Sequence, residues 1–294
     1  MKIRYCSDLH IEFNGLPSKK VFAPSVDEIL LVAGDTVPIV YLQSFRNDGR
    51  ARSMKKKFCK FLDHVSKFKE VYMIMGNHEH YGGNIDDDLS VLKSFIKKEN
   101  KWSNIHVLEN SYAYLGSNVY LLGATMWTNV RNECPHSLMF IEGYMNDFRG
   151  QIKKWKSAER NRNSTRNFTP DDSVILHKES LSYFAKIIDQ LENSKELPTV
   201  IIMTHHAPSY ESSVGNARIA NEGAAAYYSD LQEWILNRPS IKYWIHGHTH
   251  HNVNYNIGNC NVLANMRGYG VFGYEDACFK TFSLEPCIEI KRTP

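Results

Sequence analysis

The sequence lacks long apolar runs and paired cysteine motifs, and each absence narrows the class of protein. Its longest apolar stretches, such as Ile29–Ala33 and Val200–Met203, are far shorter than the ~18 residues of a membrane-spanning helix. The six cysteines form no C-x-x-C pair, and 294 residues are enough to fold without disulfides. Near the N-terminus, Asp8 interrupts any apolar signal-type core. We therefore expect a cytoplasmic protein with reduced thiols and no membrane contact.

The usual motifs for a covalent nucleophile or a phosphate-binding loop are also missing. The chain contains no G-x-S-x-G, no C-x₅-R and no G-x₄-G-K. Its composition, 43% hydrophobic and 23% charged, excludes disordered, collagen-like and coiled-coil proteins. No repeat or low-complexity tract divides the chain, so we expect a single domain over residues 1–294.

Apolar runs and turn signals predict alternating strands and helices. Strands are expected at 2–6, 28–33, 71–75, 105–108, 199–204 and 241–245, with hairpins at 112–122 and 253–264. Apolar stripes at helical spacing predict helices at 55–69, 85–98, 169–192 and 227–236. This alternation predicts an α/β layered fold.

Five short polar clusters each follow one of the strand-like runs. They are Asp8-x-His10, Gly34-Asp35, Gly76-Asn77-His78-Glu79, His205-His206 and His246-Gly247-His248. Nine of the thirteen histidines lie in or beside these clusters. If the strands lie side by side, their carboxyl ends form one rim where these side chains meet. Carboxylate, amide and imidazole ligands without thiolates suit catalytic Mn²⁺, Fe or Zn²⁺, and their number matches a site for two metal ions.

In order, the motifs D-x-H, G-D, G-N-H-E, H-H and G-H-x-H resemble those of the calcineurin-like metallophosphoesterase superfamily, and they span residues 8 to 248. The segments SDLHIE, GNHE, THHAPS and HGHTH resemble a single-domain bacterial and viral subgroup. The resemblance implies a four-layer αββα sandwich in which two mixed β-sheets are flanked by helices.

The resemblance also implies a set of site residues. One metal would be held by Asp8, His10 and His248, the other by Asn77, His205 and His246, with Asp35 bridging the two. His205 is chosen over His206 because it follows the strand directly. His78 resembles the family's catalytic imidazole, which assists the leaving group.

The implied reaction is the hydrolysis of a phosphate ester by a hydroxide that bridges two divalent metals, most readily Mn²⁺, with Fe or Zn²⁺ as alternatives. The expected substrate is a small, nucleotide-like phosphomonoester or phosphodiester. One alternative is a nuclease or a phosphatase that processes nucleic-acid ends. Another is a non-catalytic scaffold, which would be expected to have lost ligands that this chain keeps.

Several polar residues outside these ligands have open roles. Arg267, His206 and His250 are candidates for substrate binding, although Arg267 could equally form a structural salt bridge and His250 could lie on a solvent-facing loop. Glu12, Glu79 and His80 are expected to hydrogen-bond other site residues. The segment Asn146-Asp147-Phe148 is either a substrate-facing loop or a buried turn.

Two basic segments could attract a polyanion. Residues 46–69 carry a net charge of +7 and residues 149–168 one of +6, within a chain of +3. Basic loop insertions are expected near 46–57 and 149–168. Together with four aromatic residues, Phe58, Phe61, Trp155 and Phe168, they could bind nucleic acid. The alternative is a solvated helix face beside a flexible loop, with Phe58 and Phe61 in the core.

Overall fold

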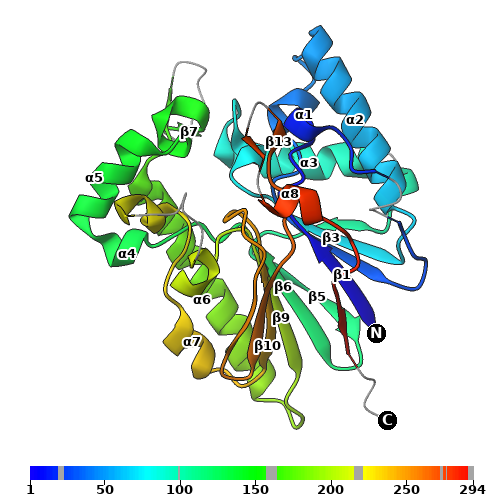
Figure 1. Ribbon diagram of the computed structural model, residues 1–294, viewed down its shortest axis with the longest axis vertical. Helices are drawn as coiled ribbons and strands as arrows, with labels where there is room; N and C mark the ends of the chain where they lie inside the picture. The colour runs from blue at the N-terminus through cyan, green and yellow to red at the C-terminus, as the bar shows by residue number, and fades with distance from the viewer. Residues whose placement is uncertain are drawn as a thin grey trace.

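Two large β-sheets form the centre of the computed structural model, which describes residues 1–18, 23–98, 100–156, 164–214, 221–271, 274–275 and 277–290. The first sheet has the order β15-β1-β2-β3-β4. Its strands are β1 (Lys2–Cys6), β2 (Ile29–Ala33), β3 (Glu70–Ile74), β4 (Ile105–Val107) and β15 (Cys287–Glu289). All neighbours are parallel except β15, which pairs antiparallel with β1 and brings the two chain ends together (Figure 1).

The second sheet has the order β11-β12-β10-β9-β6-β5. Its strands are β5 (Ser111–Gly116), β6 (Val119–Ala124), β9 (Thr199–Thr204), β10 (Ile241–His246), β11 (Asn254–Ile257) and β12 (Cys260–Ala264). The two expected hairpins, β5–β6 and β11–β12, form its edges, and the four inner strands run parallel. Both sheets are therefore mixed.

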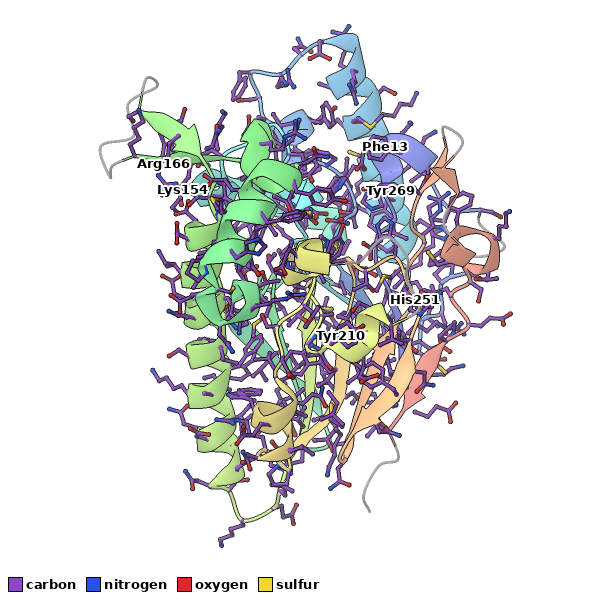
Figure 2. The ribbon with its side chains drawn as sticks, turned by 60° about the vertical axis from the view of Figure 1, so that its left-hand side comes forward. Phe13, Lys154, Arg166, Tyr210, His251 and Tyr269 are labelled. Atoms are coloured by element: carbon purple, nitrogen blue, oxygen red, sulfur yellow. The ribbon has the colours of Figure 1, made fainter. Side chains whose placement is uncertain are left out.

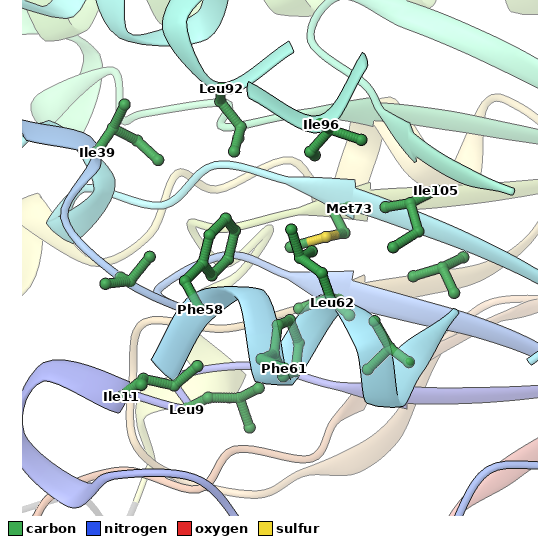
Figure 3. Close-up of a cluster of buried hydrophobic side chains, with 14 of the residues drawn as sticks. Leu9, Ile11, Ile39, Phe58, Phe61, Leu62, Met73, Leu92, Ile96 and Ile105 are labelled. Carbon is green, nitrogen blue, oxygen red and sulfur yellow. The ribbon is translucent and has the colours of Figure 1, made fainter. Parts of the chain in front are cut away.

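Helices α2 (Gly49–Val65) and α3 (Ile85–Lys98) cover the outer face of the first sheet. The side chains of Phe58, Phe61 and Leu62 on α2 are almost completely buried, and they pack with Met73 of β3 in one apolar cluster (Figure 3). The lysines of α2 occupy its opposite face, as expected for a helix with one apolar stripe.

The second sheet is covered on its outer face by α6 (Pro170–Glu192) and α7 (Gln232–Leu236), through a cluster that includes Phe184, Ile188 and Trp244. A third cluster, which includes Leu31 and Ile201, lies between the two sheets. The order of layers is helix, sheet, sheet, helix (Figure 1), so the predicted four-layer αββα sandwich is confirmed.

Two segments differ from the sequence-based expectations. Residues 49–57, expected within a basic loop, form the first half of α2, where Asp48 caps the helix by accepting a hydrogen bond from Ala51 N. Residues 227–231 are not helical, because Leu231 N-caps α7 and the chain before it pairs Tyr228 with Ala207.

The sequence also did not predict α4 (Val130–Glu133) and α5 (Pro135–Tyr144). Helix α5 has exposed apolar side chains such as Met139 and Tyr144, so its sequence shows no apolar stripe on one side.

Within residues 149–168, the described part forms a short hairpin, and residues 157–163 lie outside the described residues. Strand β7 (Lys153–Trp155) pairs antiparallel with β8 (Thr165–Asn167). The remaining short elements are α1 (Ile11–Asn14), η1 (Ile39–Leu42), η2 (His78–His80), η3 (Asn100–Trp102), η4 (Asp147–Gln151), η5 (Tyr210–Ser213), η6 (Asn221–Ala226), β13 (Gly270–Val271), β14 (Tyr274–Glu275) and α8 (Ala277–Thr281). Among the described helices, none is both long and apolar enough to span a bilayer.

Candidate metal centre

The five polar clusters meet at one edge of the sandwich, where strands of both sheets end. Strands β1, β2 and β3 of the first sheet are parallel, and each is followed at its carboxyl end by one cluster. Strands β9 and β10 of the second sheet supply the others. The loops after parallel strands share one rim, so residues as far apart in the sequence as Asp8 and His250 come into contact there.

The backbone is unusual at several of these residues. Asp8, His10, Asp35, His248 and His250 all have positive φ, between 43° and 70°. Residues other than glycine rarely adopt this conformation, and it carries a strain that the surrounding structure must offset. Such positions cluster at functional sites, where they direct side chains toward a shared point.

Two glycines permit the close approach of the loops. A Cβ atom on Gly76 would lie 2.2 Å from Asp35 Oδ1 and 2.6 Å from His205 Cε1. Gly34 has a φ of +88°, and a Cβ there would lie 2.6 Å from His205 Nδ1. The glycines of the G-D and G-N-H-E motifs are thus required because any side chain would displace Asp35 or His205.

One candidate ligand group consists of Asp8, His10 and His250, whose donor atoms lie within 4.8 Å of one another. His250 Nε2 is 3.2 Å from Asp8 Oδ1 and 3.1 Å from His10 Nε2. Sequence reasoning placed His248 in this group and His250 among the substrate contacts. The structure instead brings His250 to Asp8 and His10.

A second group consists of Asp35, His205 and His248, and a third, His10, Asp35 and His78, links the two through His10 and Asp35. His205 Nε2 lies 3.4 Å from Asp35 Oδ1 and 3.0 Å from Asn77 Oδ1, so the expected amide oxygen faces the same point. Asp35 Oδ2 is 3.6 Å from His10 Nε2. The two oxygens of Asp35 therefore face the two groups, as a bridging carboxylate would.

His246 belongs to none of the candidate groups among the described residues. Its Nε2 lies 2.9 Å from Ser212 Oγ and its Nδ1 lies 3.0 Å from Gly247 O. The physical reason is that His246 is still the last residue of β10, paired with Ala264, whereas the chain turns onto the rim only after Gly247. The G-H-x-H motif that reaches the rim is Gly247-His248-Thr249-His250.

The chemistry of these residues fits divalent metal ions. His248 Nε2 is buried and has no hydrogen-bond partner among the described residues. A buried nitrogen without a partner destabilises the folded state, and a bound cation would remove this cost. Burial lowers the pKa of His248, so its imidazole is neutral and offers a lone pair. Burial also disfavours the protonated form of His205, yet the negative charge of Asp35 raises the pKa of His205 to about 10. A site that holds so much negative charge favours a cation.

His78 is held at both ring nitrogens. Its Nδ1 lies 3.2 Å from Glu12 Oε1, and its Nε2 lies 3.1 Å from the hydroxyl of Tyr269. The same Glu12 oxygen is 3.3 Å from His10 Nδ1, so one carboxylate orients both rings. Burial opposes a charged imidazole, but Asp35 and Glu12 raise the pKa of His78. Sequence reasoning missed the role of Tyr269, although this residue lies two positions after Arg267, which it did single out.

Two other carboxylates hold the loops in place. Asp147 is buried, and its Oδ1 accepts hydrogen bonds of 2.8 Å from Asn77 Nδ2 and from the Tyr81 hydroxyl, which orients the amide so that Asn77 Oδ1 faces His205. In segment 146–148, Asp147 and Phe148 are therefore buried and support the site, whereas Asn146 is exposed. Glu79 accepts from the backbone N–H groups of Asp35 and Gly76 and so joins the loops after β2 and β3.

The remaining expected substrate contacts are occupied within the protein. Arg267 is 8% exposed, and its Nη1 donates to the carbonyl oxygens of Leu9, at 3.2 Å, and of Gly15, at 2.6 Å. His206 lies 3.3 Å from Thr125 O through Nδ1, and burial lowers its pKa to about 3. Both side chains support the loops around the site in this arrangement.

Comparison with known proteins agrees with this geometry. The calcineurin-like phosphoesterase family matches residues 1–252, so the chain belongs to that family and is a metal-dependent phosphoesterase. No curated protein matches the sequence at a significant level.

Solved structures share the fold. The phosphopantetheinyl hydrolase PptH from Mycobacterium tuberculosis is 13% identical with a TM-score of 0.59, over 91% of this chain and 89% of that one. A putative 5'-nucleotidase from Staphylococcus aureus is 14% identical with a TM-score of 0.45, over 98% of this chain and 53% of that one. At these identities the first likeness supports the fold and nothing finer.

Proposed function

We propose that this chain hydrolyses a small phosphomonoester or phosphodiester with two divalent metal ions. The observation that carries the proposal is the position of Asp35 between two candidate ligand groups. Asp35 belongs to one of them, with His205 and His248, beside Asn77. Its Oδ2 lies 3.6 Å from His10 of the other, which also contains Asp8 and His250. Carboxylate, amide and imidazole donors suit Mn²⁺, Fe and Zn²⁺, and we take Mn²⁺ as the first candidate. When bound, such metals neutralise phosphate oxygens and lower the pKa of water.

The protein's own contribution centres on His78. Glu12 holds the Nδ1 side of the ring, so the Nε2 side is the one available to donate a proton to the departing oxygen. Tyr269 occupies Nε2 in the present structure and keeps the ring oriented until a substrate oxygen takes that place. The backbone N–H of His78 donates to Asp35 Oδ1 at 2.9 Å, which ties the imidazole to the shared carboxylate.

The proposal is tested by measuring hydrolysis of p-nitrophenyl phosphate and of bis(p-nitrophenyl) phosphate with Mn²⁺, with Zn²⁺ or with a chelator. We expect activity with metal and none with chelator. The variant His78→Ala should retain its metal content and lose about 10²–10⁴-fold in kcat, the usual contribution of a general acid. Hydrolysis that persists at full rate in chelator would refute the metal-dependent mechanism.

The structure gives little support to the alternative that the substrate is a nucleic acid. Of the four aromatic residues proposed to stack on bases, Phe58, Phe61 and Phe168 are at most 2% exposed and so cannot do so. Five lysines of segment 46–69 are exposed, at positions 55, 56, 60, 67 and 69, which fits a solvated helix face. Steeply salt-dependent binding of an oligonucleotide would favour this alternative nonetheless.

A further inference from the structure

A cavity of about 590 Å³, within the range of small-molecule sites, is lined in part by Gly82–Asn84, the segment that follows the catalytic loop with His78. One wall is the segment between η1 and α2, with Gln43 and Phe45. The other wall is the β7–β8 hairpin, with Lys153, Trp155 and Thr165, and the segment Gly82–Asn84 with Asp87 completes the lining. We call this cavity the hairpin pocket.

The hairpin pocket is connected to the catalytic loops by short stretches of chain. Gly82 follows His78 by four residues, so the two lie within ~14 Å of each other even for a fully extended chain. The hairpin is fixed to this segment by two backbone hydrogen bonds, Gly82 N to Gln151 O at 2.7 Å and Lys153 N to Gly83 O at 3.1 Å. Because His78 is the expected proton donor to the leaving group, a cavity within this distance of His78 is within reach of the organic part of the ester.

The walls of the pocket carry aromatic rings that could stack on a planar group. Phe45 is 75% exposed, so its ring is accessible to a ligand. On the opposite wall, the indole of Trp155 is fixed by a hydrogen bond of 2.9 Å from Nε1 to Asp87 Oδ2. A ring held in this way loses little conformational freedom when a ligand packs against it.

Polar groups beside the rings favour a heterocycle over a hydrocarbon. The side-chain nitrogen of Asn84 is buried without a hydrogen-bond partner among the described residues, and Gln43 and Thr165 add amide and hydroxyl groups. Lys153 contributes a positive charge to the lining, and Lys154 and Arg166 lie on the same hairpin (Figure 2). Aromatic faces together with amide edges are the elements that proteins use to bind nucleobases.

We propose that the hairpin pocket binds the base of a nucleotide whose phosphate lies at the metal centre. This inference rests on the proposed phosphoesterase function, and it narrows the substrate class to nucleotides. The metal-ligand groups hold the phosphate end, whereas the pocket selects the organic end. Removal of the aromatic wall should therefore weaken the recognition of the base and leave the recognition of the phosphate intact.

The test compares two inhibitors of p-nitrophenyl phosphate hydrolysis that differ only by the base, adenosine 5'-monophosphate and ribose 5-phosphate. We expect the wild type to bind the nucleotide at least about tenfold more tightly, the size of one stacking contact. In Phe45→Ala this preference should fall to about twofold, while inhibition by ribose 5-phosphate stays unchanged. Tyr114→Ala, which removes an exposed aromatic ring from edge strand β5, is the matched control and should keep the preference.

The outcomes separate the two proposals. Hydrolysis of p-nitrophenyl phosphate with equal inhibition by both compounds would overturn the base pocket and leave the phosphoesterase function standing. The same holds if Phe45→Ala weakens both inhibitors equally. If no hydrolysis occurs with any metal, the proposed function fails, and calorimetric binding of the same two compounds decides whether the pocket still discriminates the base.

Discussion

At the scale of single residues, the position of a histidine relative to the end of its strand decides its role. His246, the last residue of β10, bonds to Ser212 and Gly247, whereas His248 and His250 lie beyond the strand and join the two ligand groups. The sequence places all three in one short motif and does not show where the strand ends. The backbone supports the distinction, because His248 and His250 both have positive φ.

This distinction predicts different results for two matched substitutions. His250→Gln should lose metal and most activity, since His250 lies within 3.2 Å of both Asp8 and His10 donor atoms. His246→Gln should keep its metal content and lose only about 1–3 kcal/mol of stability from a buried hydrogen bond. Metal analysis of the purified variants and their rates with p-nitrophenyl phosphate check this. Loss of metal from His246→Gln alone would contradict the assignment of His250.

At the scale of elements, the long helix α6 shows how a local sequence signal and a tertiary contact combine. Thr169 and Asp172 form a reciprocal cap, in which the Thr169 hydroxyl accepts from Asp172 N and the Asp172 carboxylate accepts from Thr169 N. This cap could be expected from the sequence Thr169-Pro170-Asp171-Asp172. The hydrogen bond of 2.7 Å from Arg166 Nη2 to Asp172 Oδ1 could not be expected from the sequence, because it depends on where β8 lies relative to the start of α6.

The cap predicts a pH-dependent stability. Burial acts to raise the pKa of Asp172, but Arg166 and Thr169 outweigh it and lower the pKa below the ordinary value of 3.8. A carboxylate with a lowered pKa stabilises the folded state above pH 3.8 and loses that contribution as the pH falls below it. Asp172→Asn should therefore cost about 1 kcal/mol at pH 7 and make unfolding less sensitive to acid. Urea unfolding of both proteins at pH 7 and pH 3 measures this, and equal losses at both pH values would argue against it.

At the scale of the whole molecule, the candidate ligands join the two sheets. Asp8, Asp35 and Asn77 follow strands of the first sheet, and His205 and His248 follow strands of the second. Metal ions at this rim would connect the sheets at the edge where the loops carry strained backbone. Binding to the folded state alone raises stability in proportion to the logarithm of the metal concentration.

Metal removal should therefore lower the melting temperature. At a Mn²⁺ concentration ~100 times the dissociation constant, the gain of ~2.7 kcal/mol should raise Tm by about 5 °C over the chelated protein. In Asp35→Asn this shift should nearly vanish, because Asp35 belongs to two of the three candidate groups among the described residues. Thermal unfolding followed by circular dichroism measures the shift. A full shift in Asp35→Asn would show that the stabilising metal binds elsewhere.

The sequence by itself was enough to predict the layers and the place of most candidate ligands at the strand ends, because both depend on local order. Apolar runs of strand length and stripes of helical spacing follow from the periodicities of the two structures, and the polar clusters follow directly after the runs. The sandwich was expected on these grounds together with the family resemblance. Asp8, His10, Asp35, Asn77 and His205 all lie where the strand ends imply.

Only the tertiary structure decided which side chains face one another. It places His248 and His250, and not His246, in the candidate ligand groups, because β10 still includes His246 and only the residues beyond Gly247 reach the rim. It also placed Tyr269 beside His78, 191 positions earlier in the chain, and placed Arg267 where its side chain donates hydrogen bonds to backbone carbonyl groups. Contacts between distant loops depend on how the two sheets pack, and the periodicity of the sequence contains no information about that packing.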